Sequence, residues 1–163
     1  MSTVAIAISR AGPLCSVQDA GRFGMLRHGV SASGPMDRGA FARAAGWIGG
    51  AAPAGIEFTG AGLAFRVDGG PLGVGFDGGA FMLKRNGATV PWPARIMLQA
   101  GDEIDISPGP AGNYGYLRFD RELMLEPVMG SRSTNSIAGL GGLEGRPLRA
   151  GDRLDFGGEV ERH

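Results

Sequence analysis

Short runs of alternating apolar and polar residues dominate the chain from Gly55 onward, and turn-forming residues separate them about every 8 to 12 positions. Alternation with a period of two is typical of half-buried β-strands, because successive side chains point to opposite faces. Asn86-Gly87 favours a tight type I′ hairpin, since both residues tolerate positive φ. This spacing predicts an antiparallel barrel or sandwich. The expected strands cover Val4–Ile8, Ile56–Phe58, Leu63–Val67, Leu72–Phe76, Phe81–Lys84, Ile96–Leu98, Ile104–Ile106 and Tyr114–Leu117.

One segment has the pattern of a helix. Ser33-Gly34-Pro35 is typical of a helix start, and Asp37 then lies in the first turn, where a carboxylate stabilises the helix dipole. Gly49-Gly50 ends the pattern. We therefore expect a mainly β protein with one clear helix. Its apolar face is formed by Phe41, Ala44, Ala45 and Ile48.

Length and charge limit the class of protein. A chain of 163 residues fits one domain, which we expect to cover residues 1–156, followed by a frayed tail at 157–163. Sixteen basic and sixteen acidic residues cancel without forming a block of like charge. The charge pattern of a nucleic-acid or membrane-surface binder is therefore missing, and a small neutral or singly charged ligand suits the composition better.

Cysteine and histidine are scarce. Cys15 is the only cysteine, which excludes an intramolecular disulfide and fits a reducing compartment. With one cysteine and two histidines no soft-ligand metal cluster can be assembled, so no metal site is expected. The apolar run Val4–Ile8 is too short for a signal peptide or a membrane span. The expected location is the cytoplasm.

The stretch Ser16–Asp37 is polar and punctuated by glycine. It contains Gln18, Asp19, Arg22 and His28. Glycine permits turns with positive φ and leaves backbone amides uncovered, so such a segment can converge on an anionic or amide-like small molecule. The alternative is a long connection that caps a sheet. Both interpretations stay open, because long loops in compact domains are either functional or disordered.

Nucleotide-binding motifs are incomplete in this chain. The glycines from Gly139 onward miss the dinucleotide pattern by one position, since Glu144 stands where the third glycine belongs. The chain has no Gly-Lys dipeptide, which excludes a P-loop.

A hydrolytic triad can be drawn from His28, one of two serines (Ser31 or Ser33) and one of two aspartates (Asp19 or Asp37). These groups supply the base, the nucleophile and the orienting carboxylate that acyl transfer needs. Spacing this loose arises often by chance. We therefore prefer His28 as a ligand-contacting or structural hydrogen-bond donor.

Two further features place polar groups in unusual settings. Glu57 stands in an apolar strand. If it faces the core it needs a partner such as Arg22 or Arg132, and if it faces solvent it has no special meaning. Gly130–Thr134 offers three hydroxyls, a guanidinium and a glycine-freed amide in five residues, which suits an anion. Its hydroxyls could equally cap their own turn.

Taken together, several motifs resemble one family. They are V-Q-D-x-G-R at 17–22, G-V-S-x-S-G-x-M-D at 29–37, the strand around Glu57, G-S-R-S-T at 130–134, and A-G-L-G-G-L-E-G-R-x-L-x-A-G-D at 138–152. The resemblance is to the carboxyltransferase or allophanate hydrolase subunit 2 family, which includes KipA and the C subunit of bacterial 5-oxoprolinase. It runs in order from about Pro13 to Phe156 and covers only the N-terminal half of the family pattern.

The resemblance implies a cyclophilin-like antiparallel β-barrel that works beside a companion subunit of the KipI type (allophanate hydrolase subunit 1). It implies a part of an ATP-dependent 5-oxoprolinase, a hydrolase that opens 5-oxoproline to glutamate with a LamB/YcsF-type third subunit. One alternative is a component of a biotin-dependent urea or amide carboxyltransferase. Another is a non-catalytic regulatory protein that antagonises a KipI-like kinase inhibitor. The substrate would be a small amide, and ATP or carboxybiotin would belong to the complex.

The resemblance also assigns binding roles to both glycine-rich segments. It leaves the catalytic residues unknown, with His28, Glu57 and Arg132 as candidates. These segments can line one pocket only if the fold brings them side by side. The chain departs from the family after Tyr116, where Leu117–Glu122 is charged instead of small and glycine-rich. The predicted binding residues are Gln18, Asp19, Arg22, His28, Asp37, Glu57, Ser131, Arg132, Ser133 and Thr134.

Overall fold

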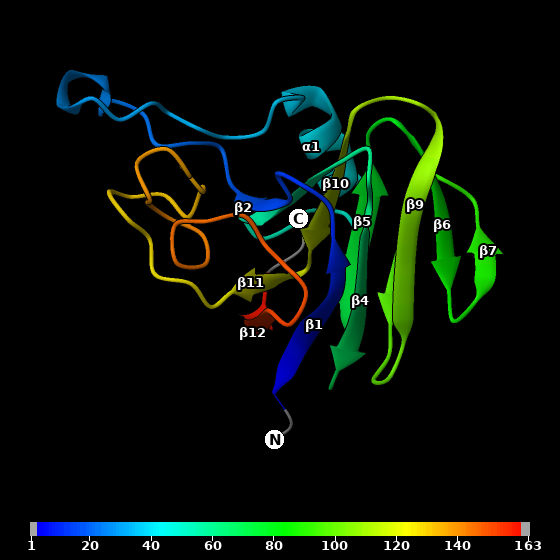
Figure 1. Ribbon diagram of the computed structural model, residues 1–163. Coiled ribbons are helices and arrows are strands. Elements are labelled where there is room, and N and C mark those ends of the chain that lie inside the picture. The colour runs from blue at the N-terminus through cyan, green and yellow to red at the C-terminus, as the bar shows by residue number, and fades with distance from the viewer. Residues whose placement is uncertain (1–2, 161–163) are drawn as a thin grey trace.

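The computed structural model describes residues 3–160 and forms two antiparallel sheets with one α-helix (Figure 1). The larger sheet has seven strands and the smaller has five. In spatial order the larger sheet contains β11 (Arg121–Leu123), β12 (Arg153–Glu159), β1 (Val4–Ala11), β4 (Leu63–Asp68), β9 (Glu103–Ala111), β6 (Ala80–Arg85) and β7 (Ala88–Val90). The smaller contains β2 (Ser16–Gln18), β3 (Gly55–Thr59), β10 (Tyr114–Phe119), β5 (Leu72–Asp77) and β8 (Ala94–Leu98). The predicted mainly β, antiparallel fold is confirmed.

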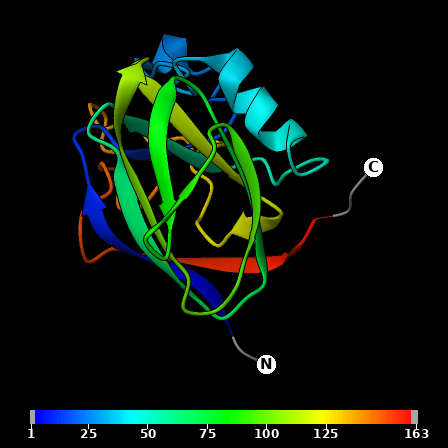
Figure 2. The ribbon, with the colours of Figure 1, turned by 90° about the vertical axis from the view of Figure 1, so that its right-hand side faces the viewer.

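The main apolar core is built from both sheets. Ile6 and Ile8 of β1 are buried in it, as are Val74 and Phe76 of β5. Burying side chains of this size contributes about 1.5–3 kcal/mol each, which makes this core the main source of stability. In Figure 2 the strands of both sheets surround a common interior, and the helix lies outside it.

The predicted antiparallel β-barrel is not closed within the described part of the chain. Within residues 3–160, β7 and β11 end the larger sheet, β2 and β8 end the smaller one, and no strand pairing joins these edges. The chain passes from β7 to β8 through Pro91-Trp92-Pro93. Proline has no N–H donor, so this connection between the sheets cannot form the regular hydrogen bonds that would pair β7 with β8.

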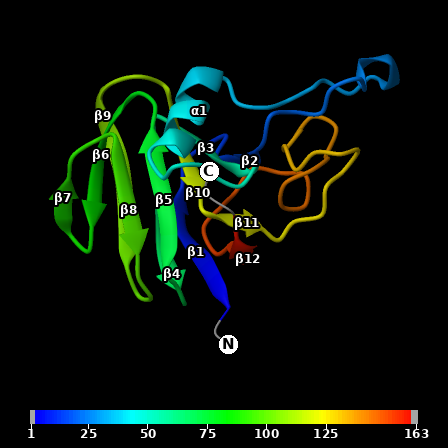
Figure 3. The same cartoon turned by 180° about the vertical axis from the view of Figure 1, so that it is seen from behind.

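The expected helix is present as α1 (Arg38–Gly46). Asp37 is its N-cap, because its side chain accepts a hydrogen bond from the amide of Ala40 at 3.0 Å. Figure 3 shows α1 from behind, against β5 and β10 of the smaller sheet. A Cβ atom at Gly75 of β5 would overlap the carbonyl oxygen of Ala44, so this glycine permits the close approach of helix and sheet.

The sequence does not predict the three shortest strands. β2, β7 and β11 contain three residues each, too few to show a period of two. β12 extends to Glu159, which pairs with Arg121 of β11. Gly157–Glu159, which the sequence assigns to a frayed tail, therefore belongs to a strand, while 161–163 lie outside the described residues.

Two long connections lie on the same side of the sheets. One joins β2 to α1 and contains a single 3-10 turn at Leu26–His28, and the other joins β11 to β12. Figures 1 and 3 show both extending from the edge of the sheets where β2 lies. These are the two glycine-rich segments that the sequence singles out.

Candidate functional site

The first contact between the two segments is a carboxylate that accepts four hydrogen bonds. Asp19 Oδ1 accepts from Ser131 Oγ at 2.6 Å, Ser133 Oγ at 2.8 Å and the amide of Gly21 at 2.9 Å. Asp19 Oδ2 accepts from the amide of Arg132 at 2.7 Å. Burial disfavours the charged carboxylate and alone would raise the pKa of Asp19. The hydrogen bonds outweigh this effect, so the pKa of Asp19 is lowered. We call this cluster the Asp19 latch.

Arg22 completes the Asp19 latch. Its side chain is only 1% exposed. Nε donates to the carbonyl of Val128 at 2.7 Å, and Nη2 donates to the carbonyls of Ser131 and Ser133 at 3.1 and 3.0 Å. Gly141 permits this position, because a Cβ there would lie 2.8 Å from Nη2. The two segments lie side by side, as the predicted site requires.

Gln18 and Thr134 connect the latch to β2. Gln18 Nε2 donates to Ser16 Oγ at 2.9 Å and to the carbonyl of Thr134 at 3.3 Å, while its Oε1 accepts from the amide of Gly34 at 2.9 Å. Thr134 Oγ1 donates to the carbonyl of Val17 at 3.0 Å. These hydrogen bonds tie β2 to the backbone at Gly34 and Thr134, one residue in each of the two segments.

Glu57 lies on β3 and is 6% exposed. Its Oε2 accepts from the amide of Met36 at 2.8 Å and from the hydroxyl of Tyr116 at 2.7 Å. The Tyr116 oxygen in turn accepts from the amide of Asp37 at 2.8 Å. Burial, together with the neighbouring charges of Glu57 and Asp37, raises the pKa of Tyr116, so the hydroxyl keeps its proton and acts as a donor.

The expected partner of Glu57 is wrong. The guanidiniums of Arg22 and Arg132 bind backbone carbonyls instead, and Arg132 Nε donates to the carbonyl of Leu125 at 2.7 Å. Tyr116 takes their place because it stands directly opposite Glu57 in the ladder between β3 and β10. Sequence reasoning missed Tyr116, since only the strand register brings these two residues together.

A cavity of about 180 Å³ opens between the two segments and β3. This is below the range of about 300–1,000 Å³ typical of sites for drug-sized ligands, so it suits a smaller molecule. Glu57 is its carboxylate, and no arginine, lysine or histidine is among the described residues that line it. The lining residues are Leu14, Ser16, Gln18, Met36, Glu57, Tyr114, Thr134, Ser136 and Pro147. We call it the Glu57 cavity.

His28 lies apart from the Glu57 cavity. It ends the exposed 3-10 turn, and its Nε2 accepts from Arg27 Nε at 3.3 Å. Ser31 Oγ accepts from Asn135 Nδ2 at 3.1 Å. Among the described residues no hydrogen bond joins His28 to Ser31, Ser33, Asp19 or Asp37. The structure does not assemble the hydrolytic triad.

Arg132, Ser131 and Asp37 do not line the Glu57 cavity either. The Arg132 guanidinium faces Glu122, with 3.6 Å between Nη1 and Oε1. Ser131 belongs to the latch, and Asp37 caps α1. Of the predicted binding residues, the cavity therefore brings together Gln18, Glu57 and Thr134.

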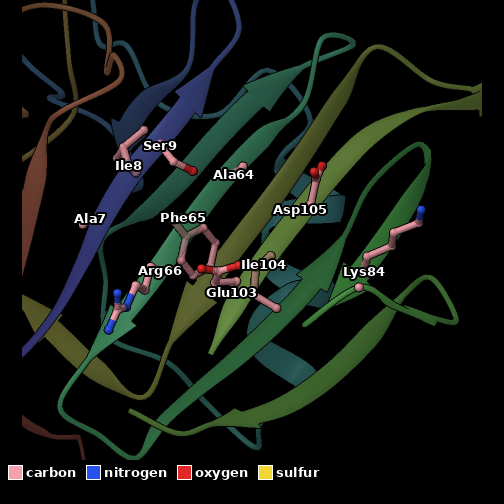
Figure 4. Close-up of a pocket in the computed structure, with 11 residues that line it drawn as sticks. Ala7, Ile8, Ser9, Ala64, Phe65, Arg66, Lys84, Glu103, Ile104 and Asp105 are labelled. Atoms are coloured by element: carbon pink, nitrogen blue, oxygen red, sulfur yellow. The ribbon is translucent and has the colours of Figure 1, made fainter. Parts of the chain in front are cut away.

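A larger hollow of about 650 Å³ lies on the outer face of the seven-stranded sheet (Figure 4). Arg66, Lys84, Glu103 and Asp105 stand along it, all on exposed faces of their strands. It contains no buried polar group and none of the predicted site residues. Convergent polar groups define a ligand site better than volume does, so we place the candidate site in the Glu57 cavity.

Comparison with known proteins decides the family. The family model described as carboxyltransferase domain, subdomain A and B, matches residues 28–163. The chain belongs to this carboxyltransferase-domain family. It is 36% identical over 155 residues to the C subunit of Escherichia coli 5-oxoprolinase, covering 92% of this chain and 48% of that protein. The chain thus spans about half the length of this relative.

Other carboxyltransferase-domain relatives are larger. The chain is 30% identical over 154 residues to urea amidolyase of Saccharomyces cerevisiae, covering 92% of this chain and 8% of that protein. The crystal structure of the Kluyveromyces lactis urea carboxylase superposes with a TM-score of 0.89 at 29% identity, covering 96% of this chain and 14% of that one.

Residues 3–160 contain neither a cluster of metal ligands nor a helix that could span a membrane. No group of three or more His, Cys, Asp or Glu side chains in this part of the family domain is placed to hold a metal ion. No helix in the same range has the length and apolarity needed to cross a bilayer.

Proposed function

We propose that the chain is one component of a cytoplasmic, ATP-dependent amide-processing complex. The first candidate is a 5-oxoprolinase that opens 5-oxoproline to glutamate, with a KipI-type companion subunit and a LamB/YcsF-type subunit. The 36% identity to the C subunit of Escherichia coli 5-oxoprolinase over 92% of the chain supports this candidate. The chain spans 48% of that relative, so the activity of the whole relative enters here only as a proposal.

The Glu57 cavity carries the proposal. It is small, lies between the two segments that resemble the family motifs, and combines one buried carboxylate with hydroxyl and amide groups. Groups held in place by hydrogen bonds orient a substrate and stabilise charge without reorganising. Of the three catalytic candidates, Glu57 alone lines this cavity, while His28 and the Arg132 guanidinium lie outside it.

ATP or carboxybiotin belongs to the complex in this proposal and not to this cavity. A polyphosphate needs cationic or amide-rich surroundings. The described lining offers a carboxylate and no basic side chain, so it does not fit a triphosphate. We therefore assign to this chain only the binding and orientation of the amide substrate.

The second candidate is a component of a biotin-dependent urea carboxylase. It is favoured by the TM-score of 0.89 to the Kluyveromyces lactis urea carboxylase and by a cavity of about 180 Å³, large enough for urea. The identity of 29% is lower than that to the 5-oxoprolinase relative, so this candidate ranks second.

The test is reconstitution from the genes that neighbour this one. The chain, its companion and a LamB/YcsF-type subunit are combined with ATP, and glutamate formed from 5-oxoproline is measured with and without this chain. Urea-dependent consumption of carboxybiotin is measured in parallel with a biotin carboxylase partner. We expect turnover of one substrate only when the chain is present. Stable binding of the companion without turnover of either substrate would contradict the proposal and favour a regulatory binding protein.

A further inference from the structure

We propose that Glu57 and Ser16 form a paired recognition site for the edge of a cis amide, as found in lactams and in urea. Glu57 would accept the substrate N–H through Oε1, and Ser16 would donate its hydroxyl to the substrate carbonyl. The cavity then favours an uncharged amide over a carboxylate as the group that lies beside Glu57. The inference rests on the proposed function in taking this cavity as the substrate site, and it names the chemistry that the site selects.

The acceptor is the free oxygen of Glu57. Its Oε2 is already engaged by the Met36 amide and the Tyr116 hydroxyl. Within residues 3–160 no hydrogen bond reaches Oε1, although the side chain is only 6% exposed and lines the cavity. A carboxylate oxygen that has no donor within the described residues is available to an N–H group of a ligand in the cavity.

The donor is the hydroxyl of Ser16. Its oxygen accepts from Gln18 Nε2 at 2.9 Å, so its own proton is free to be donated. Ser16 is the direct cross-strand partner of Glu57 in the ladder between β2 and β3. Paired side chains of this kind lie on one face with their Cβ atoms about 4.5–5.5 Å apart. Both residues line the cavity, so an acceptor and a donor stand next to each other.

A cis amide is the complementary group. In a lactam the ring holds N–H and C=O on the same edge, and urea presents the same edge. An open-chain secondary amide prefers the trans form, which turns the two groups in opposite directions. The Ser16 and Glu57 pair can therefore bind both groups of a lactam at once, but only one group of a trans amide.

A carboxylate inside the Glu57 cavity would have no positive partner. No basic side chain is among the described residues that line it, and the guanidiniums of Arg22 and Arg132 bind the carbonyls of Val128 and Leu125. An anion placed beside Glu57 would be repelled by it. In 5-oxoproline the carboxylate is carried by the ring carbon next to the N–H, so we expect it to weaken binding unless it turns toward the mouth beside Leu14 and Met36, which are 61% and 68% exposed.

The test is ligand-observed NMR on the purified 163-residue chain with a matched set of small molecules. 2-Pyrrolidinone is the bare lactam, N-methyl-2-pyrrolidinone lacks its N–H, N-methylacetamide is a trans amide, and 5-oxoproline adds a carboxylate. We expect 2-pyrrolidinone to bind at least about tenfold more tightly than each of the others, as loss of a hydrogen bond to a charged group predicts. Glu57→Gln should weaken 2-pyrrolidinone binding about tenfold, and Ser16→Ala about threefold to tenfold.

A surface variant keeps the test valid if the buried variants fail to fold. Met36→Lys places a cation at the mouth and should raise the affinity for 5-oxoproline about two- to fivefold, whereas the matched control Met36→Gln should not. Equal binding of 2-pyrrolidinone and its N-methyl analogue, or no binding of 2-pyrrolidinone, would overturn the inference. If the complex turns over neither substrate while this order of affinities holds, only the proposed function fails. If the complex turns over a substrate but the order of affinities is reversed, only this inference is overturned.

Discussion

The Asp19 latch and the Glu57 cavity are built from the same two glycine-rich segments, but they differ in how their carboxylates are used. Both oxygens of Asp19 accept hydrogen bonds from within the chain. Among the described residues only Oε2 of Glu57 does so, and the Glu57 side chain lines the cavity. A saturated carboxylate ties two segments together, whereas a half-saturated one leaves an atom for a ligand. The comparison distinguishes residues that stabilise the two segments from residues that are available to bind a ligand.

The largest expected effect is on the stability of the latch. Asp19→Ala removes the acceptor of four donors, so we expect the free energy of unfolding to fall by about 3 kcal/mol or more. Thermal unfolding followed by circular dichroism measures this. Asp105→Ala is the control, because within residues 3–160 the exposed Asp105 side chain pairs with Arg10 alone, and its loss should cost about 1 kcal/mol at most. Equal losses in the two variants would contradict a special role for the latch.

Tyr116→Phe should affect both stability and binding. It removes one donor to Glu57 Oε2 and leaves the amide of Asp37 without its acceptor, at a cost of about 1–3 kcal/mol. Glu57 is then less fixed, and binding of 2-pyrrolidinone should weaken a few-fold. Tyr114→Phe is the matched control for stability alone, since the Tyr114 hydroxyl forms no hydrogen bond with another described residue but Tyr114 lines the cavity. A Tyr116 variant that binds like the wild type would show that Glu57 does not depend on this contact.

Acid should weaken the latch. The pKa of Asp19 is lowered in the folded state, so its contribution to stability is complete above the ordinary aspartate pKa of about 3.9. That contribution is lost as the pH falls through the lower folded value. The difference in Tm between the wild type and Asp19→Asn should therefore be largest near neutral pH and shrink below about pH 4. A difference that stays constant down to about pH 2 would contradict the assigned ionisation.

Arg132→Ala should separate the two regions. The guanidinium binds the carbonyl of Leu125 and faces Glu122, so its loss should cost about 0.5–1.5 kcal/mol of stability. It does not line the Glu57 cavity, and the affinity for 2-pyrrolidinone should stay within about twofold of the wild type. A tenfold loss of affinity would place Arg132 in the binding site.

The last prediction concerns the reactivity of Cys15, which directly precedes β2. Burial, followed by the negative charges of Glu57 and Asp152, raises the pKa of its thiol to about 12. A thiol-specific reagent should therefore react with the folded protein slower than with the unfolded protein by a factor on the order of 10². Glu57→Gln should increase this rate slightly, because it removes one of the charges. Rapid labelling of the folded wild type would contradict the burial of Cys15.

Much of the fold could be predicted from local signals. Strands such as β4 and β5 show period-two alternation between glycine turns, and Asp37 marks the start of α1 as its cap. The three-residue strands could not be predicted, because their pairing depends on neighbours distant in sequence. Barrel closure was likewise not predictable, since it depends on whether edge strands meet.

The candidate site could be predicted only in part. Family resemblance singled out Gln18, Glu57 and Thr134, which the fold brings to one cavity. The same motifs included Asp19 and Ser131, whose hydrogen bonds are internal to the latch. Sequence alone cannot distinguish these two groups, because saturation of a polar atom is a property of the folded contacts. The pairings of Glu57 with Tyr116 and Ser16 follow from strand register, which the sequence did not specify.

The most direct test is a map of backbone amide chemical shifts by two-dimensional NMR as 2-pyrrolidinone is added to the chain. The account predicts that the largest changes occur at Ser16, Met36 and Ser136, around the Glu57 cavity, while Gly21 and Arg132 of the latch stay nearly unchanged. Changes centred on the latch, or on Lys84 and Asp105 in the hollow of the larger sheet, would contradict the assignment of the binding site.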